Sequence, residues 1–180
     1  MRIHIVGASC VGSTTLGKSL SALYNIPYFD TDDYFWILSE VPFTLKRAPL
    51  LRNEMLKDDL DKTESYIVGG SLVSWGEEWK SRFDLVVFLY APAEIRLARL
   101  KKREIERYGT AIYDNPERNL LFARFIEWAS KYDDRDFTGR NIKLHEDWIE
   151  SVKCTVLQIK GDTTVEERLK VIQKALNYYR

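Results

Sequence analysis

The sequence has no excess of charge of either sign. Lys plus Arg and Asp plus Glu each number 27 among the 180 residues, so the formal net charge is zero. A chain without net charge has no overall field that would attract nucleic acid or an anionic membrane surface. We therefore expect neither of these partners, and any recognition of an anion must be local.

Cysteines and long apolar runs are also scarce. The two cysteines, Cys10 and Cys154, lie far apart and lack the spacing of metal ligands. No apolar run approaches the roughly 20 residues needed to cross a bilayer, and the first residues do not resemble a signal peptide. These absences favour a soluble protein in the reducing cytoplasm.

The chain is long enough to bury one sizeable core. Its hydrophobic content is 45% and its aromatic content 13%, and it contains no internal repeat or low-complexity tract. Residues 1–180 are therefore expected to form a single domain, in a monomer or weak dimer.

The clearest motif lies at residues 7–15, which read GASCVGSTT. It follows the short apolar run 2–6 and precedes a helical pattern of leucines over 14–24, as a loop between a strand and a helix does. The template of a phosphate-binding loop is G-x-x-x-x-G-K-[ST]. Both glycines and the threonines match this template, but serine occupies the lysine position.

Backbone N–H groups at the start of a helix can bind a di- or triphosphate without that lysine. The alternative is an ordinary strand-to-helix turn, which the position of the loop and its paired threonines disfavour. Thr14 is also a predicted Mg²⁺ ligand, through its hydroxyl. The residues predicted to bind the nucleotide phosphates are Gly7, Ala8, Ser9, Cys10, Val11, Gly12, Ser13, Thr14 and Thr15.

Strand patterns alternate with helix patterns along the chain, which predicts an α/β protein with a parallel sheet covered by helices on both faces. In such sheets ligands bind beyond the carboxyl ends of the strands. The glycine loop and an acidic segment, 30–33, both lie at such ends. The predicted strands are 2–6, 27–30, 66–70, 84–90 and 155–159.

Three carboxylates, those of Asp30, Asp32 and Asp33, follow the second predicted strand. Carboxylate oxygens suit Mg²⁺, and a carboxylate can also orient a substrate hydroxyl and accept its proton. We assign Asp30 to the metal and Asp32 to the hydroxyl, with the two roles interchangeable on this evidence. The alternative is a solvated acidic turn in which Asp33 caps a helix.

Without the loop lysine, phosphoryl transfer requires a cation from elsewhere. Arg96, Arg99 and Arg103 follow the fourth predicted strand at spacings of three and four, which puts them on one helix face. Arg103 is the predicted catalytic residue because it is nearest the break before Gly109, where a lid can begin. A solvated surface is the expected place of Arg96 and Arg99.

Two further residues are predicted to bind the second substrate. Arg47 lies, with Arg52, in a region that has the composition of a substrate flap, where a guanidinium suits an anion, although a solvated surface is equally compatible. Trp75 follows the third predicted strand and either lines the cleft or belongs to the core. His4 and His145 have no cluster of partners and are interpreted as structural.

From end to end, the chain resembles the adenylate-kinase-like branch of P-loop kinases. The resemblance rests on the glycine loop, on DTDD at 30–33, on DLVVFLY at 84–90 and on RLARLKKRE at 96–104. It implies a three-layer α/β/α P-loop NTPase fold with a five-stranded parallel sheet, a flap at about 34–63 and a short lid at about 107–116. It also implies that Gly161 and Asp162 lie near the adenine ring.

Within that branch, DTDD is more similar to the acidic segments of shikimate and gluconate kinases, and the loop without lysine is similar to loops of archaeal-type cytidylate kinases. The resemblance implies a kinase that uses ATP and Mg²⁺ to phosphorylate a small acceptor. The alternatives are a nucleoside monophosphate kinase and a nucleotide-binding regulatory protein with little turnover.

Overall fold

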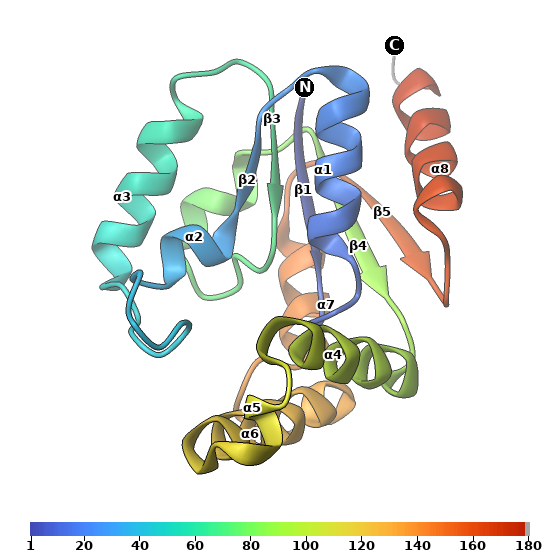
Figure 1. The fold of residues 1–180 in the computed structure, drawn as a ribbon. Helices are drawn as coiled ribbons and strands as arrows, with labels where there is room; N and C mark the ends of the chain where they lie inside the picture. Colours follow the sequence, from blue (N-terminus) through green and yellow to red (C-terminus); the bar gives the residue numbers. More distant parts are fainter. Residues whose placement is uncertain (179–180) are drawn as a thin grey trace.

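Five parallel strands form the central sheet of the computed structural model, which describes residues 1–178 (Figure 1). Their order in the sheet is β2-β3-β1-β4-β5, so the first strand is central and each connection crosses over one face. In register, Ile5 of β1 lies opposite Gly69 of β3 and Val87 of β4. The strands are β1 (Arg2–Gly7), β2 (Tyr28–Asp30), β3 (Tyr66–Gly69), β4 (Leu85–Tyr90) and β5 (Thr155–Lys160).

Residues 1–178 contain eight α-helices and two 3₁₀ helices. None of them, within residues 1–178, has the length and apolar character needed to cross a membrane. They are α1 (Ser13–Tyr24), α2 (Thr31–Phe35), α3 (Pro49–Leu60), η1 (Glu77–Ser81), α4 (Ala93–Tyr108), α5 (Ala111–Asp114), α6 (Pro116–Ser130), η2 (Lys131–Asp133), α7 (Ile142–Ser151) and α8 (Val165–Tyr178).

Two apolar layers hold the helices against the sheet, because successive side chains of a strand point to opposite faces. On one face, Ile5 and its neighbours pack against α1 and α8, with Leu16, Leu20 and Ile172 fully buried. On the other face, Val6 belongs to the layer that packs against α3, η1 and α7. The predicted α/β/α layering and the parallel five-stranded sheet are thus confirmed.

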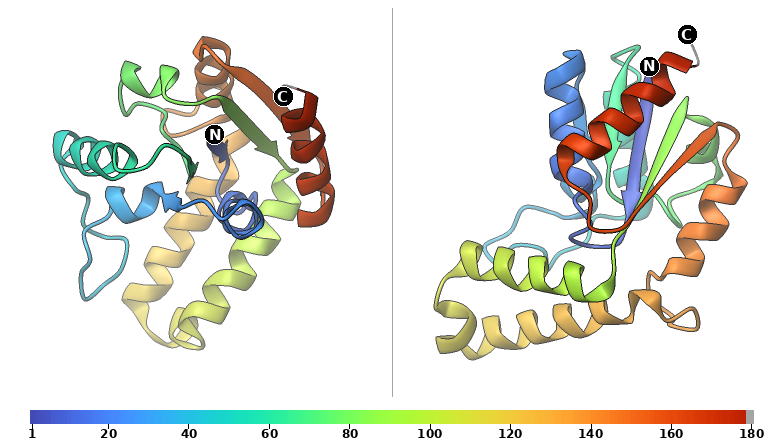
Figure 2. Two further views of the ribbon diagram at one scale, coloured as in Figure 1. Left: turned by 90° about the horizontal axis from the view of Figure 1, so that it is seen from above. Right: turned by 90° about the vertical axis from the view of Figure 1, so that its right-hand side faces the viewer.

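Helices α4 and α6 run side by side beyond the carboxyl ends of the strands (Figures 1 and 2). They form an arm that projects from the sheet, with α5 at its tip. The segment predicted as a lid, 107–116, contains the end of α4, all of α5 and the first residue of α6. The other segment near these strand ends is 36–48, which joins α2 to α3 and is closed at its base by an antiparallel bridge between Trp36 and Lys46. The predicted flap, at about 34–63, thus contains this segment and α3. Below, the word flap refers to segment 36–48 alone.

Candidate functional site

The glycine loop connects β1 to α1 in a conformation that exposes backbone donors. Cys10 and Gly12 adopt positive φ angles of 60° and 99°, and Gly12 is the N-cap of α1. The first turn of α1 contains no acidic residue, and no side chain caps it. Its N–H groups are therefore available at the positive end of the helix dipole, which is the arrangement that binds phosphate.

Arg168 of α8 supports this loop from behind. Its side chain is 3% exposed, and its Nη1 donates to the Val11 carbonyl at 2.8 Å. Its Nε donates to the Thr163 hydroxyl, also at 2.8 Å, in the turn after β5. Arg168 thereby links the phosphate loop to the segment that contains Gly161 and Asp162. Burial lowers the pKa of its guanidinium. The sequence contains no signal for this contact, because the partners are 157 residues apart.

Thr14 and Asp30, the predicted metal ligands, lie next to each other. The Thr14 hydroxyl donates to Asp30 Oδ2 at 3.0 Å, and the Tyr28 hydroxyl donates to the same oxygen at 2.9 Å. The other oxygen, Asp30 Oδ1, accepts from the Asp32 backbone N–H at 3.1 Å and caps α2. Asp30, and not Asp33, is therefore the helix cap, which corrects the alternative derived from the sequence.

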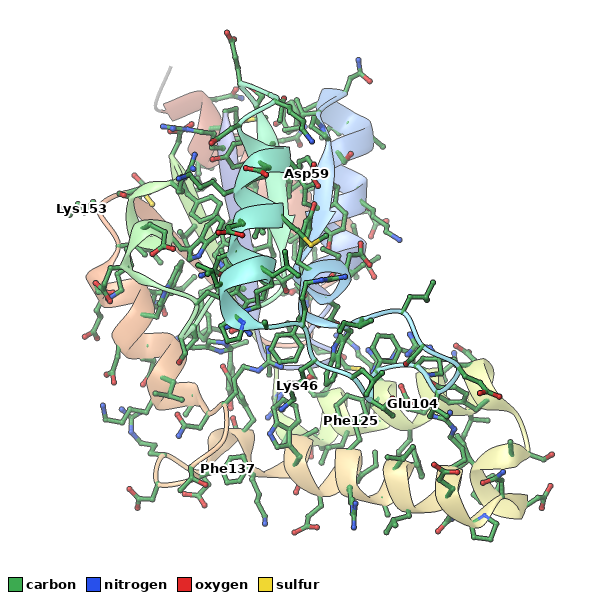
Figure 3. All side chains as sticks on the ribbon, turned by 90° about the vertical axis from the view of Figure 1, so that its left-hand side faces the viewer. Lys46, Asp59, Glu104, Phe125, Phe137 and Lys153 are labelled. Atoms are coloured by element: carbon green, nitrogen blue, oxygen red, sulfur yellow. The ribbon has the colours of Figure 1, made fainter. Side chains whose placement is uncertain are left out.

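A cavity of about 670 Å³ opens between the sheet, the flap and the arm. We call it the central cavity. Figure 3 shows Lys46 of the flap, Glu104 of α4 and Phe125 of α6 around the same space, and all three line the cavity. The lining residues that the argument below uses are Asp32, Arg52, Ser71, Trp75, Arg103 and Arg140.

Arg52 presents a buried cation to this cavity. Its guanidinium carbon lies 5.1 Å from the ring centre of Phe35 and 4.3 Å from that of Trp75. Among the described residues, its buried Nε has no hydrogen-bond partner, and its Nη2 donates to the Ser74 carbonyl at the long distance of 3.5 Å. Burial lowers the pKa of Arg52. The charge is thus stabilised by aromatic faces rather than by a carboxylate.

Arg140 is the second cation of the cavity, and it lies just before α7. Its guanidinium carbon is 5.1 Å from the ring centre of Trp128. Burial lowers its pKa, and the charge of Asp32 opposes this effect. Within residues 1–178, no ion pair shorter than 4.0 Å joins Arg52 or Arg140 to a carboxylate. Two guanidinium groups that form no close ion pair in the described part of the chain therefore line one cavity, which favours an anionic ligand.

Asp32 lines the cavity near these cations. Burial raises the pKa of its carboxyl group, and so does the neighbouring Asp30 carboxylate, whereas Arg140 and Arg103 act in the opposite direction. A carboxylate with a raised pKa that remains close to positive charges is suited to accept a proton.

Arg103 projects from α4 toward both the loop and Asp32. Burial raises the pKa of the Cys10 thiol, and Arg103 is the charge that opposes this most strongly, so it lies within electrostatic reach of the loop. Its Nε and Nη2 donate to Glu104 Oε1 at 3.2 and 3.0 Å, and its guanidinium lies over Phe125. Arg103 thus faces the space between the predicted nucleotide and acceptor sites.

Comparison with known proteins gives relatives over nearly the whole chain, although no family model matches it. The uncharacterized protein YqaC of Bacillus subtilis is 42% identical over 176 residues, which are 98% of this chain and 96% of YqaC. This chain belongs to the same family as YqaC. A shikimate kinase of Aquifex aeolicus is 29% identical over 187 aligned positions, again covering 98% of this chain and 96% of the relative.

Solved structures show the same fold. A shikimate kinase from Bacteroides thetaiotaomicron has a TM-score of 0.60 and 19% identity, and it matches over 98% of each chain. A deoxyadenosine kinase from M. mycoides with bound dATP also has a TM-score of 0.60, with 14% identity, 98% of this chain covered and 100% of that chain. This chain therefore has the fold of small P-loop kinases, as the sequence resemblance predicted.

The structure places several predicted residues differently from the expectation. Arg47 does not line the cavity; its Nη1 donates to the carbonyls of Asp33, Tyr34 and Trp36 at 3.3, 2.8 and 3.4 Å. Its predicted contact with substrate is therefore corrected to a contact that holds the base of the flap. The cation that faces the cavity from this region is Arg52, because α3 turns it inward.

The prediction that Arg96 is solvated is wrong. Arg96 is 1% exposed, and its Nη2 donates to Asp133 Oδ2 at 2.6 Å while its Nε donates to the Ala91 carbonyl at 2.9 Å. It links α4 to η2, because α6 and η2 cover the face of α4 that the sequence predicted to be solvated. Arg99 is half-exposed and pairs with Asp162, which the resemblance assigned to the adenine site.

Trp75 combines both roles that the sequence allowed. It is 6% exposed and belongs to the core layer on the α3 face, and it also lines the central cavity beside Arg52. Segment 133–140, which is charged and contains a glycine, brings Arg140 to that cavity. The sequence contains one signal for the place of Arg140: it lies directly before Asn141, whose side chain caps α7 by accepting from the Leu144 N–H.

Proposed function

We propose that this protein transfers the γ-phosphoryl group of MgATP to a hydroxyl group of a small anionic acceptor. The observation that most supports this proposal is the charge distribution of the central cavity, where the Asp32 carboxylate is combined with Arg52 and Arg140. Among the described residues, neither arginine forms an ion pair within 4.0 Å of a carboxylate. A hydroxylated carboxylic acid suits this set, because its carboxylate matches the guanidinium groups and its hydroxyl matches Asp32. Shikimate, the substrate in the name of two similar kinases, belongs to that class.

The nucleotide is expected to bind along the phosphate loop, with its phosphates at the first turn of α1 and its base near Gly161 and Asp162. Thr14 and Asp30 would hold Mg²⁺, since their oxygens suit this ion and lie 3.0 Å apart. The described residues contain no group of three or more His, Cys, Asp or Glu that would hold a metal without the nucleotide. When bound, Mg²⁺ neutralises charge on the phosphates.

Asp32 is the proposed base of the reaction. It accepts the proton of the acceptor hydroxyl while that oxygen forms a bond to the γ-phosphorus and the bond to the ADP oxygen breaks. Its raised pKa increases its affinity for the proton. Arg52 and Arg140 orient the acceptor through its anionic group, and orientation supplies much of the acceleration in phosphoryl transfer.

Arg103 is the proposed substitute for the loop lysine, because its charge acts on both Cys10 and Asp32. The variant Arg103→Met is expected to lower kcat by about 100-fold or more, as losing a cation on a transferring phosphoryl group does. Lys102→Met is the matched control, since Lys102 is exposed on the same helix and pairs with the exposed Glu106. Equal kcat values for the two variants would assign the role to another cation.

A nucleoside monophosphate is the second candidate acceptor. The aromatic residues of the cavity favour it, because Trp36, Phe122 and Trp128 offer flat surfaces for a base while the arginines suit a phosphate.

Calorimetric titration followed by a coupled ADP-release assay tests the proposal. ATP and ADP are titrated with and without Mg²⁺, and the assay then compares shikimate with AMP and CMP. Mg²⁺-dependent binding of ATP with turnover of shikimate supports the hydroxy-acid reaction, and turnover of AMP or CMP supports the second candidate. Tight binding without turnover of any acceptor indicates a regulatory nucleotide-binding protein, and no binding of nucleotide contradicts both kinase functions.

A further inference from the structure

Three buried side chains that the proposed reaction does not use form a chain of hydrogen bonds at the wall of the central cavity. The Tyr132 hydroxyl of η2 lies 2.7 Å from His145 Nδ1, and His145 Nε2 lies 2.9 Å from Ser71 Oγ. His145 belongs to α7 and is fully buried, whereas Ser71 follows β3 and lines the cavity. The chain of hydrogen bonds therefore leads from the protein interior to the ligand space.

The direction of these hydrogen bonds follows from the donors that are present. Burial lowers the pKa of His145 to about 3, so at neutral pH one ring nitrogen donates and the other accepts. Burial also raises the pKa of the Tyr132 phenol, which keeps its proton. Within residues 1–178, His145 Nδ1 is the acceptor found within hydrogen-bond distance of that phenol.

The alternative direction is unfavourable. If Nδ1 carried the ring proton, Tyr132 would have to accept it, and the buried phenolic proton would have no partner among the described residues. A buried donor without an acceptor destabilises the structure. Tyr132 therefore donates to Nδ1, the ring proton lies on Nε2, and Nε2 donates to Ser71 Oγ.

Ser71 Oγ then accepts from His145 and keeps its own proton for another partner. No second hydrogen bond of this hydroxyl is found within residues 1–178, and its side chain lines the same cavity as Asp32, Arg52 and Arg140. We propose that Ser71 donates a hydrogen bond to an oxygen atom of the acceptor bound in the central cavity, and that His145 and Tyr132 are positioning residues that orient this donor. This inference rests on the proposed function, because it requires the cavity to be the acceptor site.

The consequence concerns specificity. A serine hydroxyl that accepts from His145 keeps its own proton for the cavity. It therefore favours an acceptor with an oxygen at that place over an analogue that lacks it. Ser71 thus adds a neutral donor to the two cations, and it acts on the binding of the acceptor rather than on the nucleotide.

The ring tautomer is the first test, and it needs no acceptor. Long-range ¹H–¹⁵N NMR spectra of the full chain with labelled histidine distinguish a protonated Nε2 from a protonated Nδ1, and His145→Gln assigns the signals between the two histidines. We expect protonated Nε2 at pH 7. Tyr132→Phe removes the donor to Nδ1 and is expected to shift the ring toward the other tautomer. A protonated Nδ1 in the unmodified protein would overturn the inference.

Steady-state kinetics with MgATP and shikimate as the probe acceptor are the second test. Ser71→Ala is expected to raise KM for shikimate about tenfold, with KM for ATP unchanged. Tyr132→Phe is expected to raise it in the same sense, because the other tautomer lets Ser71 donate to His145 instead of to the acceptor. Ser71→Thr, which keeps the hydroxyl, is expected to restore much of the affinity.

Tyr66→Phe is the matched control for these kinetics. Tyr66 is also buried, and its hydroxyl donates to the Arg82 carbonyl at 2.9 Å, away from the cavity. If Tyr66→Phe and Tyr132→Phe change KM for shikimate equally, or if Ser71→Ala changes it less than twofold, the inference is wrong. If the unmodified protein neither binds nor phosphorylates shikimate, that result contradicts the proposed acceptor. The tautomer measurement then still tests whether Ser71 accepts from His145 and keeps its proton for the cavity.

Discussion

Replacing Arg52 by methionine is expected to change the stability of the fold little while weakening acceptor binding strongly. The guanidinium has cation–π contacts with Phe35 and Trp75, and together these stabilise the fold by about 1 to 4 kcal/mol. Burying a cation without a counterion costs about the same order of free energy. Because the two effects oppose each other and methionine keeps an apolar chain, the free energy of unfolding should change by about 1 kcal/mol or less.

Acceptor binding lacks such compensation. A hydrogen bond to a charged group contributes about 1.5 to 3 kcal/mol, and about 1.4 kcal/mol corresponds to a tenfold change in affinity. In Arg52→Met, KM for shikimate should therefore rise by about 10- to 150-fold. KM for ATP should stay constant, because the contacts of Arg52 are with Phe35, Ser74 and Trp75 and not with the phosphate loop. Urea unfolding and steady-state kinetics measure the two quantities.

Arg96→Met is the control, for which we expect a loss of stability and no change in KM for the acceptor. Arg96 is also buried, but it is paired with the partly exposed Asp133, so its removal leaves a carboxylate without its partner. Losing this hydrogen bond between charged groups costs about 1.5 to 3 kcal/mol, with no effect expected on KM for the acceptor. If Arg52→Met were as destabilising as Arg96→Met and left KM unchanged, Arg52 would be structural and the argument for an anionic acceptor would fail.

Three further predictions concern the base, the loop and the buried histidines. Asp32→Asn should lower kcat by a factor of about 10² to 10⁴ without weakening the binding of MgATP measured by calorimetry. Burial and a neighbouring carboxylate raise the pKa of Asp32, so kcat of the unmodified protein should fall on acidification at a higher pH than for an ordinary aspartate. Gly12→Ala should weaken MgATP binding and destabilise the fold by about 1 to 3 kcal/mol, because the φ of Gly12 is 99° and the new Cβ would lie 2.7 Å from Arg168 Nη1. Gly109→Ala is the control for backbone strain, because Gly109 also has a positive φ, 58°, but its new Cβ would meet no described atom within 4 Å. Burial lowers the pKa values of His4 and His145 to about 4 and about 3, so unfolding takes up protons below pH 6.5. The free energy of unfolding, measured in urea, should therefore fall by about 1 kcal/mol per pH unit for each ring between pH 6 and 4. A profile that is flat in this range contradicts the assignment.

Patterns that are local in the chain predicted the architecture well. The glycine loop between residues 2–6 and 14–24 has its expected place, and the predicted strands 84–90 and 155–159 correspond to β4 and β5. Such patterns succeed because hydrophobic periodicity and glycine positions depend on a few neighbouring residues. The order of the strands was not predicted, since it depends on which crossover covers which face.

Side chains that act across long sequence separations were not predictable in the same way. Arg96 has the spacing of a surface arginine, but its burial depends on η2, whose Asp133 lies 37 residues further along the chain. Arg47 and Arg52 are five residues apart in one basic stretch, and only the direction of α3 decides which of them lines the cavity.

The sequence by itself determined the parallel α/β architecture, the place of the phosphate loop and the acidic pair at the end of the second strand, because each of these depends on residues that are neighbours in the chain. Only the tertiary structure decided which cations and hydroxyls complete the site. Arg168, Arg140 and the chain from Tyr132 to Ser71 meet there because the sheet order and the packing of α6 to α8 bring distant segments to the carboxyl ends of the strands. These residues bind partners that only folding brings close, so no spacing along the chain predicts their contacts.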